Sequence, residues 1–167
     1  MLNKISRSLI FSVFFLFSIE ASSQTFVFTA IPDEDESKLR ARFDKVAVYL
    51  NDELGTAVRY VPVKSYSAAV SAFRNNQVQL AWFGGLSGVR ARNLVKDSKA
   101  IAQGVEDPNF KTYFIAHSST GLTKSSSFPK KIAGMTFTFG SKGSTSGRLM
   151  PEYFIRKNFH HGHHTNL

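Results

Sequence analysis

Short strand-like segments alternate along this chain with longer helix-like segments, and this alternation limits the possible folds more than any other feature. The strand-like segments are rich in β-branched and aromatic residues, while the helix-like ones carry apolar residues three or four positions apart. The strand-like segments are residues 25–31, 57–63, 80–83, 100–105, 113–117 and 135–139. The helix-like segments are residues 33–54, 65–73, 86–94 and 148–159. Strands separated by helices predict βαβ units and a mainly parallel sheet, which is an α/β fold.

The longest helix-like segment carries clear start and stop signals. An acidic run at residues 33–36 suits the positive N-terminal end of a helix. One apolar stripe follows it, formed by Leu39, Phe43, Val46, Leu50 and Leu54. Gly55 then favours a helix C-cap, and Ser65 is placed to cap the next helix.

The loops that follow the first three strand-like segments are the expected place for a ligand. In parallel sheets, ligands bind at the carboxyl ends of strands, in the loops that lead to helices. Here those loops are residues 32–36, 64–66 and 84–87. Because the carboxyl ends of parallel strands share one edge of the sheet, we expect the three loops to lie together.

The first 23 residues have the order of a secretory signal peptide. Lys4 and Arg7 form a basic start, residues 8–19 are almost wholly apolar, and small residues at 21–23 precede a predicted cleavage between Ser23 and Gln24. A transmembrane anchor is the alternative, but it needs about 20 apolar residues to cross the bilayer core. The sequence therefore predicts an exported, soluble mature protein.

Composition narrows the classes of function. The chain has no Cys, which excludes disulfides, thiolate chemistry and zinc sites built on Cys. Without residues 1–23 the net charge falls from +9 to +8, and the basic residues are scattered, with Lys130-Lys131 as the longest run. A basic chain suits nucleic acid, an anionic surface or a small anion. Export argues against nucleic acid as a partner.

Residues 140–147 (GSKGSTSG) are the most informative segment, because they lie between a strand-like and a helix-like segment. Glycines let the backbone turn tightly and approach a ligand. Ser144, Thr145 and Ser146 offer hydroxyl donors beside the unpaired N–H groups of a helix start, an arrangement that suits an anion with three oxygens. A plain Ser/Thr helix cap after a flexible loop is the alternative reading. The segment does not have the Gly and Lys spacing of a P-loop.

The same segment, with Phe139 before it and Leu149-Met150-Pro151 after it, resembles the signature of a known family. This family comprises the phosphate-, phosphite- and phosphonate-binding periplasmic proteins of ABC transporters (PhnD-like). Three more segments resemble family segments in the same order. They are Ser65-Tyr66 with its Ala-rich helix, residues 78–84, and Tyr113-Phe114. The resemblance covers roughly residues 24–159.

The resemblance implies a type II periplasmic binding protein, a two-lobed Venus-flytrap fold that closes over its ligand. Residues 24–112 would form the first α/β lobe and residues 113–159 the start of the second, before a His-rich tail at 160–167. Ser144, Thr145 and Ser146 would bind the phosphorus oxyanion, and Tyr66 and Tyr113 would line the site. The implied partner is an ABC permease in the inner membrane, and the implied location is the periplasm. No cofactor, metal or enzymatic activity is implied.

The end of the chain departs from the family pattern. Family members continue for about another hundred residues, as a second lobe of ordinary domain size requires. Residues 160–167 instead include four His in five positions. A truncated or frame-shifted reading is our interpretation, and metal binding by the neutral imidazoles is the alternative. Because a flytrap site needs donors from both lobes, we expect a chain without the rest of the second lobe to bind weakly or not at all.

Two further functions remain as alternatives to transport. The same fold also suits a ligand sensor that reports to a signalling partner. A periplasmic phosphoester hydrolase would use Asp33, Asp35, Asp44 and the five His as acid, base or metal ligands. The chain contains no H-E-x-x-H or G-x-S-x-G motif, which disfavours an enzyme.

We predict that the exported protein begins near Gln24, because a basic start, an apolar segment and small residues at 21–23 occur in the order of a signal peptide. Intact-mass measurement of the protein recovered from the periplasm checks this. A soluble cytoplasmic product that still carries residues 1–23 would contradict it.

Overall fold

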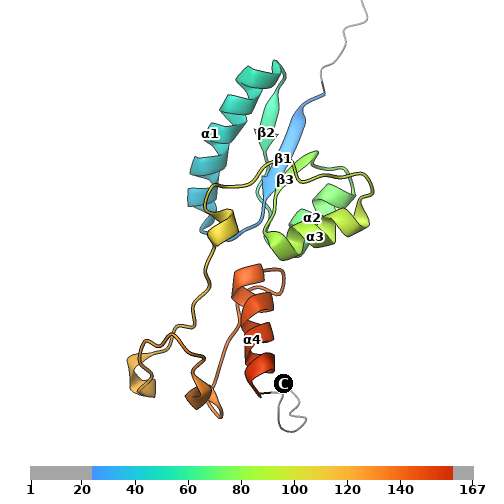
Figure 1. The fold of residues 1–167 in the computed structure, drawn as a ribbon. Coiled ribbons are helices and arrows are strands. Elements are labelled where there is room, and N and C mark those ends of the chain that lie inside the picture. The colour runs from blue at the N-terminus through green and yellow to red at the C-terminus, as the bar shows by residue number, and fades with distance from the viewer. Residues whose placement is uncertain (1–23, 160–167) are drawn as a thin grey trace, which may run out of the picture.

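The computed structural model describes residues 24–159, so the predicted signal peptide and the His-rich tail at 160–167 lie outside the described residues. A three-stranded parallel sheet organises the first part (Figure 1). Its strands are β1 (Phe26–Ala30), β2 (Val58–Tyr60) and β3 (Leu80–Trp82), in the order β2-β1-β3. Phe28 in the central strand is paired with Tyr60 on one side and Leu80 on the other. The predicted βαβ arrangement is confirmed for these strands.

Helices cover both faces of this sheet. Helix α1 (Glu36–Leu54) lies on one side, and α2 (Tyr66–Arg74) and α3 (Gly85–Leu94) lie together on the other (Figure 1). Among the described residues, none of the helices is long and apolar enough to span a membrane.

The predicted helix caps at Ser65 and Gly55 are confirmed, and Asp35, within the acidic run, also caps a helix. The side chain of Asp35 accepts a hydrogen bond from the backbone N–H of Ser37 at 2.9 Å, and Ser65 accepts one from Ala68 at 3.1 Å. Both bonds satisfy N–H groups that have no partner within the helix. Gly55 ends α1 in the left-handed conformation, at φ 60°, which costs glycine little.

The core of this part lies between α1 and the sheet. Its buried residues are Phe28, Ala30, Leu39, Phe43 and Tyr60. The ring of Phe43 stacks on Tyr60 with centroids 5.1 Å apart, and Phe28 lies 5.4 Å from Tyr60. These contacts fix α1 against β1 and β2, and so fix the loops at the carboxyl ends of the strands.

Three of the predicted strands are not strands in the structure: residues 100–105, 113–117 and 135–139. Short 3₁₀ turns lie among them instead, at Asp107–Asn109 (η1), Ser118–Thr120 (η2) and Lys130–Ile132 (η3). A strand needs a neighbouring strand to bond its backbone and a surface to bury one face. Residues 24–159 provide no partner strand for these segments, and Val105 and Ile115 are each 93% exposed.

The last helix begins earlier than predicted. Helix α4 (Met150–Phe159) is preceded without a break by one turn of π-helix, Thr145–Leu149 (η4). The helical path therefore starts at Thr145, three residues before the predicted start at Arg148. This shift makes Ser144 the N-cap residue, and its side chain accepts a hydrogen bond from Gly147 N.

We predict that Phe43→Ala lowers the free energy of unfolding by about 3–5 kcal/mol, because the change leaves a cavity between α1 and the sheet. Tyr49→Ala on the same helix is the matched control, since Tyr49 is 61% exposed and should cost less than about 1 kcal/mol. Urea unfolding measures both. Equal losses for the two variants would show that the core is elsewhere.

Candidate functional site

The loop at residues 140–147 lies against the starts of α2 and α3, at the carboxyl ends of the strands. Contacts link α3 directly to the π turn η4, and the backbone N–H of Leu86, at the start of α3, bonds to Thr145. The 140–147 loop therefore approaches the edge of the sheet at which the sequence predicts a ligand.

The loop is closed by its own backbone. Gly140 donates from its N–H to the carbonyl of Gly147 at 2.7 Å, and a Cβ on Gly140 would lie only 3.1 Å from the Cα of Gly147. Ser144 donates from its N–H to the carbonyl of Ser141 at 2.9 Å. The Ser144 hydroxyl accepts from Gly147 N at 2.9 Å. This geometry needs glycine at Gly140, because a side chain there would meet the opposite backbone.

Thr145 connects the loop to helix α3. Its hydroxyl oxygen accepts a hydrogen bond from the backbone N–H of Leu86 at 2.8 Å, across 59 positions of sequence. Leu86 lies in the first turn of α3, where N–H groups have no partner within the helix. The N-cap residue of α3 is Gly84, which has no side chain to supply one. Thr145 therefore serves as a cap from a distant part of the chain.

Tyr66, the first residue of α2, meets the same loop. A Cβ on Gly143 would overlap the Tyr66 side chain and lie 2.9 Å from its Cγ, so only glycine permits this approach. Burial raises the pKa of the Tyr66 phenol, hydrogen bonding with Ser144 lowers it, and the charge of Asp33 raises it, with a net upward shift. The phenol therefore stays protonated at neutral pH and is a permanent hydrogen-bond donor.

Three helix starts thus meet at residues 143–145 within the described part of the chain: α2 at Tyr66, α3 at Leu86, and the π turn that leads into α4. Each presents backbone N–H groups and the positive end of its dipole. The hydroxyls of Tyr66, Ser144 and Thr145 add further donors. Such a set of hydroxyl donors and helix starts is suited to hold an anion.

The other two predicted site residues are placed differently. The carbonyl of Ser146 accepts a hydrogen bond from the Thr112 hydroxyl at 2.6 Å, which ties residues 112 and 146 together. Tyr113 follows Thr112, but its side chain is 75% exposed, and the structure does not bring it against Tyr66 or Ser144. Of the predicted set, Tyr66, Ser144 and Thr145 lie together.

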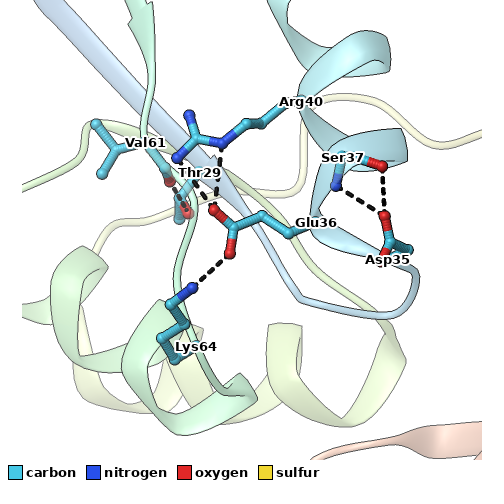
Figure 2. A network of polar contacts seen from close by, with 7 residues as sticks. All are labelled: Thr29, Asp35, Glu36, Ser37, Arg40, Val61 and Lys64. Atoms are coloured by element: carbon cyan, nitrogen blue, oxygen red, sulfur yellow. Dashed lines mark hydrogen bonds and ion pairs between the residues drawn. The ribbon is translucent and has the colours of Figure 1, made fainter.

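A polar network holds the loop before Tyr66 in place (Figure 2). Glu36, in the first turn of α1, binds both Arg40 and Lys64. Hydrogen bonds from Lys64 and then Arg40 lower the pKa of the Glu36 carboxyl. The hydroxyl of fully buried Thr29 donates to the carbonyl of Val61 at 2.6 Å. These contacts anchor residues 61–64 to β1 and α1, and thereby position the start of α2.

Sequence reasoning included Leu86 and Gly143 only as members of the loops at 84–87 and 140–147, and it missed Thr112. Leu86 contributes only its backbone, and Gly143 contributes only the absence of a side chain. Two adjacent glycines at 84–85, where a helix begins without a capping side chain, were the available signal for Leu86. Nothing in the sequence marked Thr112.

Of the acidic residues that a hydrolase would use, Asp35 has a structural role. The Asp35 carboxylate caps α1, and its hydrogen bonds with Ser37 lower its pKa. Within residues 24–159, no three His, Asp or Glu side chains gather in a group able to hold a metal ion.

Comparison with known proteins gives consistent matches to one family. A family model described as "ABC transporter, phosphonate, periplasmic substrate-binding protein" matches residues 28–164. A probable ABC transporter phosphite-binding protein, PhnD1 of Prochlorococcus marinus, is 42% identical over 155 residues, which cover 92% of this chain and 52% of that protein. The phosphonates-binding periplasmic protein of Escherichia coli is 26% identical over 163 residues, covering 91% and 48% respectively.

A solved structure has the same fold. PhnD1 from Prochlorococcus marinus, in complex with methylphosphonate, matches with a TM-score of 0.65 and 37% identity, over 81% of this chain and 50% of that one. The chain thus spans about half the length of the proteins it matches. It has the type II periplasmic-binding-protein fold over the part that is compared. The family match over most of the residues and the 42% identity together show that the chain belongs to the family of periplasmic phosphonate-binding proteins of ABC transporters.

Proposed function

We propose that this protein captures a phosphorus oxyanion, such as a phosphonate, phosphite or phosphate, in the periplasm and delivers it to an ABC permease in the inner membrane. The observation that carries the proposal is the meeting of three helix starts and three hydroxyls at residues 143–145. Each of these tetrahedral oxyanions presents at least three oxygens, and each oxygen accepts hydrogen bonds from such donors. The relative solved with methylphosphonate supports the same class of ligand.

In this proposal Ser144, Thr145 and Ser146 bind the anion through their hydroxyls and backbone N–H groups, and Tyr66 donates from its phenol. Tyr113 completes the site from the neighbouring segment. The bond between Thr112 and Ser146 supports this role, because it keeps residue 113 near the loop. Residues 24–112 act as the first lobe and residues 113–159 as part of the second.

We predict that a phosphorus oxyanion binds at the 140–147 loop. In an NMR titration with millimolar phosphate, phosphite or methylphosphonate, the amide signals of Leu86 and Ser144–Ser146 should move and then saturate with at least one of the three. NMR is chosen because it detects the weak binding expected of a site that spans two lobes. Sodium chloride at matched ionic strength is the control. Shifts that rise linearly, and equally with chloride, would argue against a specific site.

We predict that replacing any one of Ser144, Thr145 or Ser146 by Ala raises the Kd for the bound anion about tenfold to a hundredfold. A hydrogen bond to a charged group contributes about 1.5–3 kcal/mol. Thr120→Ala is the control, since the Thr120 hydroxyl donates to the nearby carbonyl of His117, in an exposed turn. Calorimetry on a version of the protein with a complete second lobe gives the Kd values. Unchanged affinity in all three variants would assign the loop to helix capping alone.

A further inference from the structure

Helix α3 depends on Thr145 for its cap. The N–H of Leu86 lies in the first turn, and Gly88 N is the donor that bonds back to the Gly84 carbonyl. The Leu86 N–H therefore precedes the helical bonding pattern, and it donates to Thr145 Oγ1 at 2.8 Å. The matching bond in α2 is local: Ala68 N donates to Ser65 Oγ at 3.1 Å, three residues away. Both helices thus have a hydroxyl cap. The cap of α2 comes from the residue just before the helix, and the cap of α3 comes from a distant loop.

A threonine hydroxyl carries one hydrogen and two acceptor lone pairs. Accepting a bond from Leu86 uses one lone pair and leaves the hydrogen to be donated elsewhere. We propose that Thr145 is a positioning residue that caps α3 through Leu86. In this role it fixes the 140–147 loop on the first lobe, and it turns its hydroxyl hydrogen toward the anion. The second part of this inference rests on the proposed function, whereas the cap itself does not.

Other contacts also bring the 140–147 loop close to α2 and α3. A Cβ on Gly85 would lie 3.3 Å from Thr145 Oγ1, so glycine here leaves room for the hydroxyl. Gly143 likewise leaves room for the side chain of Tyr66. On the other side of the loop, Arg90 of α3 donates to the carbonyl of Lys142 at 3.4 Å. The loop is therefore held to α2 and α3 by contacts on both sides of Thr145.

This arrangement couples the cap to the ligand site. A ligand that accepts the Thr145 hydrogen does not compete with Leu86 for the hydroxyl oxygen. Binding should therefore preserve the cap and strengthen it, because each hydrogen bond in such a chain polarises the next.

Amide hydrogen exchange of Leu86, measured by NMR in buffer without phosphorus compounds, tests the cap. Leu86 should exchange slowly in the unmodified protein. In Thr145→Val, which keeps the side-chain shape and removes the hydroxyl, it should exchange about fivefold faster or more. Thr145→Ser should restore slow exchange. The amide of Ala68 is the internal control and should not change in either variant.

The reciprocal variant sharpens the test. Ser65→Ala should raise the exchange rate of the Ala68 amide about fivefold or more and leave that of the Leu86 amide unchanged. If Thr145→Val does not fold, Gly143→Ala replaces it, because its Cβ would overlap Tyr66 and hold the loop away with the Thr145 hydroxyl intact. Leu86 should then exchange faster as well. Fast exchange of Leu86 in the unmodified protein, or protection that survives these changes, would overturn the cap.

Adding methylphosphonate separates the two parts of the inference. Leu86 should stay protected or exchange more slowly when the ligand is bound. Faster exchange of Leu86 on binding would contradict the inference that Thr145 bonds Leu86 and the ligand at the same time, since it would mean that the two compete for its hydroxyl. If Leu86 responds to the variants as expected, but none of phosphate, phosphite and methylphosphonate binds even to a version of the protein with a complete second lobe, the cap stands and the proposed function fails.

Discussion

Unpaired backbone N–H groups at the starts of helices govern how this molecule is put together. Each helix that follows a parallel strand begins at the same edge of the sheet, and each exposes donors that its own turns cannot satisfy. Asp35 and Ser65 satisfy such donors locally, in α1 and α2. At α3 the local residue is a glycine, so the donor is met by Thr145 from another part of the chain. The demand for hydrogen-bond acceptors at this edge thus brings the distant loop to the place where an anion would bind.

The core and the site depend on each other through the loops between them. Phe43 and Tyr60 hold α1 on the sheet, and the Thr29 hydroxyl ties the end of β2 to β1. Glu36 connects the start of α1 to Lys64 (Figure 2). Tyr66 follows two residues later, so its phenol is placed by contacts made well outside the site. A site built this way keeps its donors aimed before a ligand arrives, which reduces the ordering that binding must pay for.

The sequence predicted the first part of the fold well and residues 100–139 poorly. The stripe from Leu39 to Leu54 and the caps at Ser65 and Gly55 are local signals, and local signals are sufficient for a helix whose apolar face meets a sheet. The alternation at 113–117 and 135–139 is equally local, but a strand is completed only by a partner strand. Within residues 24–159 those partners are absent, and side chains such as Ile115 remain exposed. The strand prediction for these segments was wrong, because the pairing that a strand requires was not available to local reasoning.

The sequence by itself determined the chemistry of the candidate site: glycines that allow close approach, and the three hydroxyls of Ser144, Thr145 and Ser146 at a helix start. It also determined the family, because the order of its motifs is a property of the chain alone. Only the tertiary structure decided which donor meets which acceptor. It set Gly143 against Tyr66 and Thr145 against Leu86, and it left Tyr113 exposed. The reason is physical: a hydroxyl at residue 145 and an N–H at residue 86 carry no mark of each other until the packing of the sheet and its helices brings them within hydrogen-bonding distance.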